Sequence, residues 1–240
     1  MDNTFTSILP TIIANFEQQG LVTRTFRRLD LSRQLLVIDA ILEESAQRGP
    51  AEMNIKHIAA RAEVSIGSLY QYFNNKEGLL NFTIALTVQQ TVSAFNEFLP
   101  YLDQLSFKEA YSIYLSTGLE WGQQEQQFVR MFAKAAYQND PQLQERVVKP
   151  IAASMLNIMR MMVKNGQEKA EIRQELDPDL LARLLHGISI ILADPILLPY
   201  LNDYFQIIDE DREHNEPLNL VMEILQRGIF VHHDKDEQTS

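Results

Sequence analysis

The stretch NIKHIAARAEVSIGSLYQYFNNKEGLL, residues 54–80, decides the fold. Apolar residues recur in it at helical spacing on both sides of a short break, which predicts two short helices joined by a tight turn. Asn54 is a favourable N-cap for the first helix, and Ser65 is a favourable N-cap for the second. Leu69 and Phe73 form one apolar stripe, which predicts that the second helix packs against the first.

The other face of the second helix differs from that of a buried hairpin. It presents Gly67, Ser68 and Gln71, which are small or able to form hydrogen bonds. A hairpin inside a core would carry large apolar side chains on both sides, and it is the alternative interpretation. The pattern favours a helix-turn-helix, in which the second helix enters a DNA major groove and the first crosses the backbone.

At these residues the sequence resembles the TetR family of bacterial transcriptional regulators. The resemblance runs from about Leu31 to Leu80, through LLVIDAILEESAQRG (35–49), IAARAEVSIGSLYQYF (58–73) and NKEGLL (75–80). It implies an all-helical homodimer. In such a dimer an N-terminal three-helix domain with the helix-turn-helix binds a palindromic operator, and a larger helical domain binds an inducer.

The sequence departs from the family pattern in two places. Glu63 stands in the turn where the family often has glycine, which predicts a non-glycine residue at positive φ. About thirty residues precede the first matched helix, with an apolar part that includes Ile8 and Phe16 and a basic part that includes Arg24 and Arg28. This extension is either a small helix packed on the body or an arm that touches phosphates or a minor groove.

The residues predicted to contact DNA lie at the starts of the first and third helices and along the second. Ser65 and Ser68 are expected to approach bases or phosphates, and Gly67 is expected to permit close approach. Ile66 suits a thymine methyl group, and Gln71 can read a base. The predicted set is Asn54, Lys56, Ser65, Ile66, Gly67, Ser68 and Gln71, with three phosphate anchors, Tyr70, Tyr72 and Lys76.

The net charge of −11 is unevenly distributed. Residues 1–80 carry 8 Lys+Arg and 9 Asp+Glu, whereas residues 81–240 carry 13 and 23. An acidic C-terminal part repels the phosphate backbone and leaves the N-terminal face for DNA.

The chain has no cysteine, which excludes disulfides and thiolate chemistry and fits a reducing compartment. No basic segment precedes the first apolar stretch, so we expect a cytoplasmic protein without a secretory signal.

The pattern beyond residue 80 remains helical, so the predicted fold is all-α. We divide the chain into an N-terminal extension (1–30), a helix-turn-helix domain (31–80, motif 54–73), a ligand-binding and dimerisation domain (81–232) and a flexible tail (233–240). Pro150 is expected to kink or split its helix. Helices are predicted over 33–48, 54–61, 65–72, 76–98, 106–121, 124–137, 141–165, 178–198 and 217–231.

The C-terminal part offers candidates for an effector pocket and for a dimer interface. Its aromatic and methionine side chains usually form plain core, but together they can line an adaptable apolar cavity. The pocket candidates are Tyr111, Tyr114, Trp121, Phe128, Phe132, Met155 and Met159. Apolar residues of the last two helices predict the dimer interface, namely Leu181, Leu185, Ile188, Leu192, Leu220, Ile224 and Leu225.

The segment 180–201 is almost long enough to span a bilayer, but charged residues and prolines interrupt it. We therefore expect a core helix that also faces a partner subunit, and no membrane partner.

None of the five histidines lies at metal-ligand spacing, and no phosphate loop or nucleophile elbow occurs. Hence no catalytic residue, metal or cofactor is predicted, and an enzyme or a protein–protein adaptor on an all-helical fold is the alternative.

The favoured interpretation is a homodimeric repressor of a double-stranded DNA operator. We expect a small apolar or amphipathic effector to release it by changing the separation of the two recognition helices.

Overall fold

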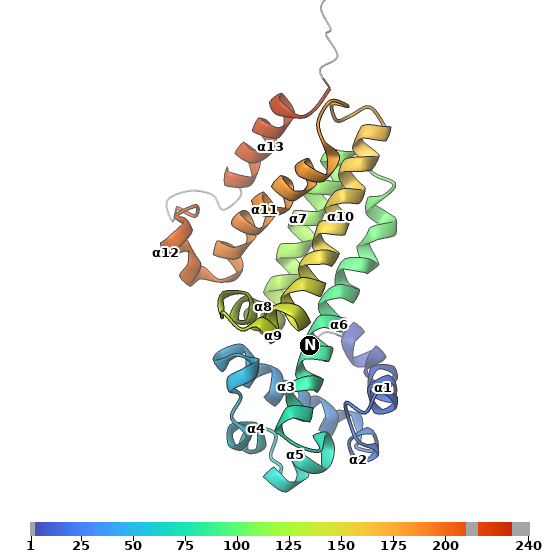
Figure 1. Ribbon diagram of the computed structural model, residues 1–240, viewed down its shortest axis with the longest axis vertical. Coiled ribbons are helices and arrows are strands. Elements are labelled where there is room, and N and C mark those ends of the chain that lie inside the picture. The colour runs from blue at the N-terminus through green and yellow to red at the C-terminus, as the bar shows by residue number, and fades with distance from the viewer. Residues whose placement is uncertain (1–2, 210–215, 232–240) are drawn as a thin grey trace, which may run out of the picture. The chain divides into compact units, whose positions relative to one another are not determined.

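The computed structural model describes residues 3–209 and 216–231. Within this part of the chain the regular structure is helical, apart from a single β-bridge between Ile172 and Phe230 (Figure 1). The all-α prediction is therefore confirmed. The predicted flexible tail at 233–240 lies outside the described residues.

The helices form two compact units. Unit 1 comprises residues 1–94 and 121–152, and unit 2 comprises residues 95–120 and 153–240. Unit 1 contains α1 (Asn3–Gln18), α2 (Arg24–Arg27), α3 (Leu31–Arg48), η1 (Pro50–Glu52), α4 (Ile55–Arg61), α5 (Ile66–Phe73), α8 (Gln126–Tyr137), α9 (Pro141–Leu143) and η2 (Gln144–Val148). Unit 2 contains α11 (Pro178–Leu197), η3 (Pro199–Leu201), α12 (Asn202–Phe205) and α13 (Glu216–Gly228). Both units receive residues from α6 (Lys76–Leu102), α7 (Phe107–Gln124) and α10 (Lys149–Glu168).

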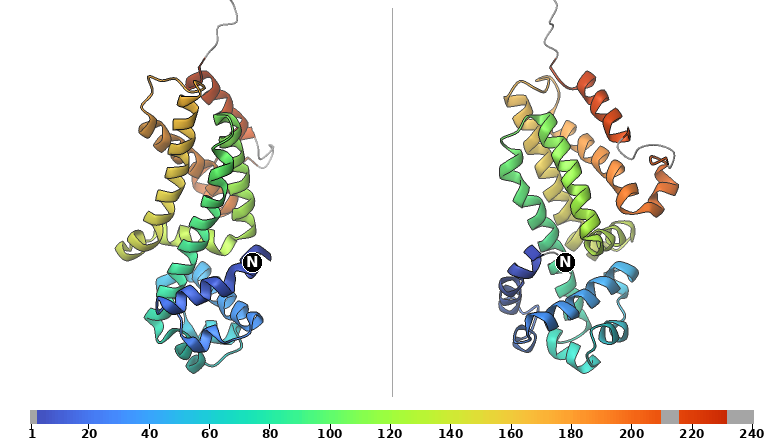
Figure 2. Two further views of the ribbon diagram at one scale, coloured as in Figure 1. Left: turned by 90° about the vertical axis from the view of Figure 1, so that its right-hand side faces the viewer. Right: turned by 180° about the vertical axis from the view of Figure 1, so that it is seen from behind.

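The N-terminal extension shares the core of unit 1 with the helix-turn-helix. Phe16 of α1, Phe26 of α2, Phe73 of α5 and Phe82 of α6 are all fully buried and form one aromatic cluster. The ring centroids of Phe26 and Phe73 lie 5.1 Å apart, and those of Phe73 and Phe82 lie 4.8 Å apart. In both views of Figure 2, α1 and α2 (dark blue) lie against the other helices of this unit. The apolar part of the extension is thus a packed helix.

Side-chain caps begin most of the helices that the sequence predicted. Asp30 accepts the backbone N–H of Arg33 at 2.9 Å, and Asp140 accepts that of Gln142 at 2.8 Å. Asp177 caps α11, whose first residue is Pro178. A proline at the first helical position loses no hydrogen bond, because that N–H has no partner within the helix.

Two prolines affect the helices differently. The expected break at Pro150 appears as η2, a π-helical turn that separates α9 from α10. Pro100 instead lies inside α6, which continues to Leu102 although the predicted helix stopped at 98. Only the last turn of α6 is affected there, so the missing N–H removes one hydrogen bond without ending the helix.

The core of unit 2 joins α7, α10, α11 and α13. Tyr111, Met159 and Ile172 are fully buried, and Leu185 is 1% exposed. The Glu171 carboxylate accepts the backbone N–H of Phe107 at 2.6 Å, which holds the start of α7.

The turn between α5 and α6 requires glycine at position 78. Asn74 has φ 65°, and the Asn75 side chain accepts the backbone N–H of Gly78 at 2.8 Å. A Cβ atom at Gly78 would collide with the carbonyl oxygen of Phe73. The chain therefore passes from one helix to the next with the two backbones in close contact.

We expect Gly78→Ala to destabilise the protein by about 1–3 kcal/mol, because the added methyl group forces the α5–α6 turn open. Gly118→Ala in α7 is the matched control, since a Cβ atom there meets nothing within 4 Å. That control should gain up to about 1 kcal/mol from helix propensity. Thermal unfolding of both variants checks this, and an unchanged midpoint for Gly78→Ala would contradict the close contact.

Candidate DNA-binding surface and effector pocket

The turn between α4 and α5 is held in a strained conformation. Glu63 has φ 53°, so the predicted non-glycine residue at positive φ is confirmed. The Val64 N–H donates to the carbonyl of Ala59 at 3.0 Å and closes the turn. Arg33 of α3 donates a hydrogen bond to the carbonyl oxygen of Glu63 at 3.1 Å. The turn of the helix-turn-helix is therefore held by hydrogen bonds from within the motif and from α3.

Helix α5 is divided into a buried and an exposed side. Leu69 and Phe73 are 1% and 0% exposed and anchor it in the core of unit 1. The opposite side presents Ile66, Gly67, Tyr70 and Gln71 to solvent, while Ser68 is half-buried. Exposed positions thus follow helical periodicity along the whole of α5.

The N-terminus of α5 is organised by its own side chains. The Ser65 hydroxyl oxygen accepts the backbone N–H of Ser68 at 2.9 Å, and the two hydroxyl groups also lie 2.9 Å apart. A Cβ atom at Gly67 would meet only the Ser65 oxygen, at 3.6 Å. The backbone at Gly67 is therefore open on its outer side.

Tyr72, one of the three predicted phosphate anchors, lies on the buried side of α5 and not on this outward face, where we expected it. Its side chain is 7% exposed, and its ring lies 5.6 Å from the ring of Phe26. Tyr72 follows Leu69 by three positions, so both fall on the buried side of the helix. The extension supplies Phe26, which covers Tyr72, and nothing in residues 54–80 indicated this cover.

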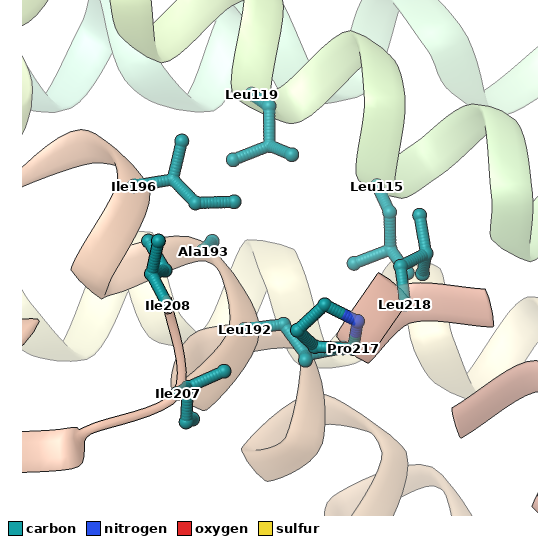
Figure 3. Close-up of a pocket in the computed structure, with 9 residues that line it drawn as sticks. All are labelled: Leu115, Leu119, Leu192, Ala193, Ile196, Ile207, Ile208, Pro217 and Leu218. Atoms are coloured by element: carbon teal, nitrogen blue, oxygen red, sulfur yellow. The ribbon is translucent and has the colours of Figure 1, made fainter. Parts of the chain in front are cut away.

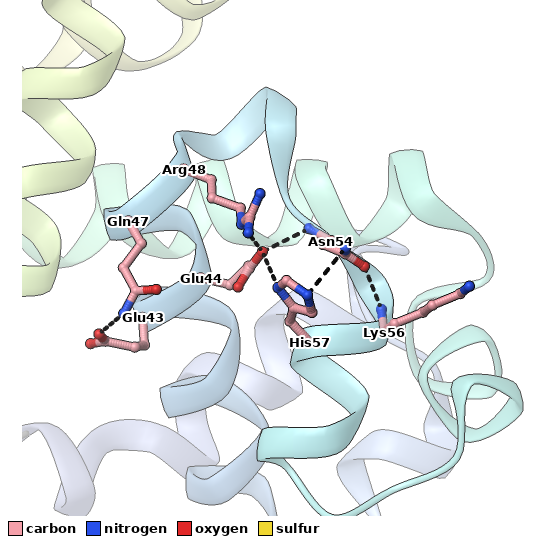
Figure 4. Close-up of polar contacts among 7 residues, drawn as sticks. All are labelled: Glu43, Glu44, Gln47, Arg48, Asn54, Lys56 and His57. Atoms are coloured by element: carbon pink, nitrogen blue, oxygen red, sulfur yellow. Dashed lines mark hydrogen bonds and ion pairs between the residues drawn. The ribbon is translucent and has the colours of Figure 1, made fainter.

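The first helix of the motif is attached to α3 by a buried carboxylate, which sequence reasoning missed. Glu44 is 4% exposed and accepts a hydrogen bond from the backbone N–H of Asn54 at 3.1 Å (Figure 4). It also forms an ion pair with Arg48, whose Nε lies 2.9 Å from the same oxygen. His57 Nδ1 lies 3.4 Å from the same oxygen. A buried carboxylate needs such partners, because its desolvation would otherwise be costly. The helical spacing of Glu44 from the buried Val37 and Ile41 was the available signal.

Asn54 and the two lysines of the predicted set occupy different positions. The Asn54 side chain accepts the backbone N–H of Lys56 at 3.0 Å, so it serves as the N-cap of α4. The Lys56 side chain points away from this cluster into solvent (Figure 4). Lys76 is exposed at the first position of α6. Both lysines are thus free to meet an anionic surface.

Unit 2 contains an apolar hollow between α7, α11 and α13 (Figure 3). Its enclosed volume is about 30 Å³, and the hollow measures about 410 Å³ when the adjoining open space is included. All nine lining residues are apolar, namely Leu115, Leu119, Leu192, Ala193, Ile196, Ile207, Ile208, Pro217 and Leu218.

None of the seven predicted pocket residues lines this hollow, which corrects that prediction. Trp121, Phe128 and Phe132 belong to unit 1, where the rings of Trp121 and Phe128 stack with centroids 6.3 Å apart. Tyr114 and Met159 are buried in the core of unit 2, as is Tyr111, and Met155 is half-buried. Aromatic and methionine residues at helical spacing have their usual role here, which is core packing.

A polar pair lies one helical turn from the hollow. The Tyr111 hydroxyl is 3.2 Å from the Ser189 hydroxyl, and these residues precede Leu115 and Ala193 by four positions on α7 and α11. Burial raises the pKa of Tyr111, and the hydrogen bond to Ser189 partly offsets this. Burial also lowers the pKa of His186 on α11, so its imidazole is neutral at pH 7. The Tyr111–Ser189 pair is thus polar and uncharged.

The predicted dimer interface needs a correction. Leu181, Leu185 and Leu225 are 9%, 1% and 7% exposed and belong to the core of unit 2. Ile188 and Leu192 are half-buried. The exposed apolar side chains of these two helices are Leu180, Leu184 and Ile191 of α11 and Leu220 and Ile224 of α13, and the last two belong to the predicted set. Helix α11 is apolar on most sides, so periodicity could not show which stripe faces inward.

Helix α11 is also the one helix among the described residues that is long and apolar enough to cross a membrane by length and composition. Only 22% of its most apolar 18 residues are buried. Its exposed stripe recurs at positions 180, 184 and 191, which is the spacing of one helix face.

Comparisons with known proteins agree with this architecture. Residues 37–81 match the model of the bacterial regulatory proteins of the tetR family. The fatty acid metabolism regulator protein of Bacillus subtilis (strain 168) is 23% identical over 155 residues, which cover 65% of this chain and 78% of that protein.

Solved structures share the fold over most of their length. A TetR family transcriptional regulator from Chloroflexus aurantiacus J-10-FL has a TM-score of 0.63 at 20% identity, covering 88% of this chain and 99% of that one. The regulator FadR from Bacillus subtilis, in complex with stearoyl-CoA, has a TM-score of 0.61 at 22% identity, covering 82% and 99%. The chain therefore contains a helix-turn-helix domain that matches the tetR family model, and it shares its all-helical fold with solved TetR family regulators.

Proposed function

We propose that this protein is a transcriptional regulator of the TetR family, a homodimeric repressor that binds a palindromic operator and is released from it by an apolar or amphipathic effector. The observation that carries the proposal is the division of α5, whose apolar side is buried and whose small and polar side is exposed. A helix that is packed against the core on one side and exposed on the other suits insertion into a major groove.

The exposed side of α5 offers distinct groups for reading DNA. Gly67 lets the backbone approach the base edges, and Ile66 suits a thymine methyl group. Gln71 can form a bidentate pair with adenine. Lys56 and Lys76, at the starts of α4 and α6, are suited to phosphates on either side of the groove.

The surroundings of α5 support its use as a rigid reading element. The Glu44 cluster attaches α4 to α3, and Arg33 supports the turn at Glu63. A surface that is ordered before binding loses less conformational entropy on the operator. The strain at Glu63 is then a cost that the tertiary contacts of unit 1 offset.

The hollow in unit 2 supports an effector that acts by conformational selection. Its enclosed volume of about 30 Å³ is far below the roughly 300–1,000 Å³ of ligand pockets. An effector therefore needs a conformation in which α7, α11 and α13 stand further apart. Its preference for that conformation supplies the difference in affinity between two states that a switch requires.

A long acyl chain is the effector class that we favour. The lining is wholly apolar, and residues one turn apart such as Leu115 and Leu119 extend it along the helix axis (Figure 3). The fold relative FadR was solved with stearoyl-CoA. The hydrogen-bonded pair of Tyr111 and Ser189 provides polar groups near one end of such a chain.

Dimerisation is attributed to the exposed apolar stripes of α11 and α13. Leu180, Leu184, Leu220 and Ile224 are each 57–60% exposed in a single protomer. Apolar groups exposed in this way are typical of a surface covered by a partner. A homodimer built on this surface contains two recognition helices, which must lie about 34–36 Å apart to meet successive major grooves.

Gly67→Leu tests the reading surface. We expect a loss of about ten- to a hundredfold in affinity for a duplex selected from a random pool by the wild-type protein, because the side chain blocks close approach to base edges. The melting temperature should not fall, since the position is open within the protein. Fluorescence anisotropy measures the affinity, and wild-type binding by this variant would rule out the proposed docking of α5.

Leu184→Glu combined with Ile224→Glu tests the dimer surface. We expect monomers in sedimentation velocity, with weak operator binding, because the charges would be buried without partners. Tyr101→Glu is the control, since Tyr101 is similarly exposed, at 55%, but belongs to α6 and to neither stripe. A double variant that remains dimeric would place the interface elsewhere.

Ala193→Phe tests the hollow with stearoyl-CoA as the probe. We expect the wild-type protein to bind it, and bound operator to weaken that binding by the same factor by which the probe weakens operator binding. The variant should lose the response and keep its operator affinity, because the phenyl ring fills the site. Ala153→Phe, at an exposed position of α10, is the control. An unchanged response in Ala193→Phe, measured by calorimetry and anisotropy, would contradict this site.

A further inference from the structure

The N-terminal extension forms the cap at the C-terminal end of the recognition helix. The backbone N–H of Thr23 donates to the carbonyl of Tyr72 at 2.9 Å, and its hydroxyl donates to the carbonyl of Gln71 at 2.6 Å. Carbonyl groups in the last turn of a helix have no partner within the helix itself. Thr23 satisfies two of them, so the extension is joined directly to the backbone of a residue whose side chain faces outward.

Helix α2, which follows Thr23, is fixed in position. Phe26 is fully buried, with its ring 5.1 Å from that of Phe73. The Gln34 side chain donates to the carbonyls of Phe26 and Arg27 at 3.2 Å and 3.1 Å. The basic segment is therefore not a loose arm, because its backbone is held by α3 and α5.

The three arginines of this segment differ in their surroundings. Arg27 forms an ion pair with Glu17 of α1. Arg24 and Arg28 are exposed and have no acidic partner among the described residues. The Arg28 N–H bonds to the carbonyl of Arg24 at 3.1 Å, so the two lie one turn apart on the same side.

The nearest acidic side chain in sequence does not neutralise them. Asp30 accepts hydrogen bonds from the Ser32 hydroxyl at 2.5 Å and from the Arg33 N–H at 2.9 Å, as the N-cap of α3. These hydrogen bonds lower the pKa of Asp30, and the bond from Ser32 has the largest effect. The carboxylate is therefore charged and already has its hydrogen-bond donors.

We propose that the extension enlarges the DNA-binding surface, with Arg24 and Arg28 contacting operator phosphates beside the C-terminal end of α5. The proposal rests on the proposed DNA-binding function. Thr23 places this pair of cations next to Gln71, where the phosphate backbone borders the groove that α5 enters. Because α2 is already ordered, these contacts need no folding of the extension on DNA. They strengthen binding without reading sequence.

The test uses the full chain and the salt dependence of binding. The probe is the duplex selected from a random pool by the wild-type protein, measured by fluorescence anisotropy over a series of KCl concentrations. Each lost phosphate contact lowers the slope of log K against log salt by about 0.9. Arg24→Ala with Arg28→Ala removes two contacts per protomer, so the slope should fall by about 3.6 in a dimer.

Arg27→Ala is the matched control, because this neighbouring arginine is engaged by Glu17. It should keep the wild-type slope, and Arg24→Lys with Arg28→Lys should keep most of it, since the charges remain. The double alanine variant should lose affinity equally for the selected duplex and a scrambled one.

The outcomes separate the two proposals. If the wild-type protein enriches a duplex but the double alanine variant keeps its slope, the extension is only a scaffold for α5 and the inference is wrong. If the wild-type protein enriches no duplex, the DNA-binding function itself fails. Circular dichroism and sedimentation of each variant confirm that the fold and the dimer are intact, as expected for exposed side chains.

Discussion

Phe73, the last residue of the recognition helix, lies fully buried between Phe26 of the extension and Phe82 of α6. Aromatic rings at these separations add directional attraction to the burial of apolar area. This packing sets the direction in which α5 leaves the body of unit 1. The Asn74–Gly78 turn and the burial of Tyr72 follow from it, because both must accommodate a ring held on two sides.

A polar constraint complements this apolar one. Glu44 is a buried carboxylate whose partners come from α3 itself and from the start of α4. A buried ion pair contributes little net stability, but removing one partner leaves a costly unpaired charge. The cluster therefore restricts how α3 and α4 are arranged, since few arrangements of the two helices satisfy the hydrogen bonds and ion pairs of all its groups. Together with the aromatic cluster it holds both helices of the motif.

Unit 2 is organised for a different purpose. Its core is closed around Tyr111 and Met159, and the adjacent hollow has little enclosed volume. In the proposed switch, the effector selects a more open arrangement of α7, α11 and α13. Helix α6 runs without a break from Lys76 to Leu102, and its later residues Phe95 and Phe98 pack in unit 2. Like α7 and α10, it has residues in both units, so it is one element along which a change in unit 2 would reach the start of α6.

The helix-turn-helix could be predicted from the sequence, with its N-caps at Asn54 and Ser65 and the strained turn at Glu63, because these features depend on local spacing and backbone preference. The all-α class could also be predicted. Which side chains near the motif are covered depends instead on segments that are distant in the sequence. Tyr72 is buried because the extension supplies Phe26, and Thr23 reaches Gln71 across a separation of 48 residues.

The same limit applied to unit 2. Helix α11 is apolar around most of its circumference, so Leu181 and Leu185 could not be distinguished from Leu180 and Leu184 until the neighbouring helices were in place. The hollow combines residues 115–119 with residues 192–218, and neither segment shows a cavity alone. Helical periodicity reports how one helix divides into faces, whereas the partner of each face is chosen by the packing of segments far apart in the chain.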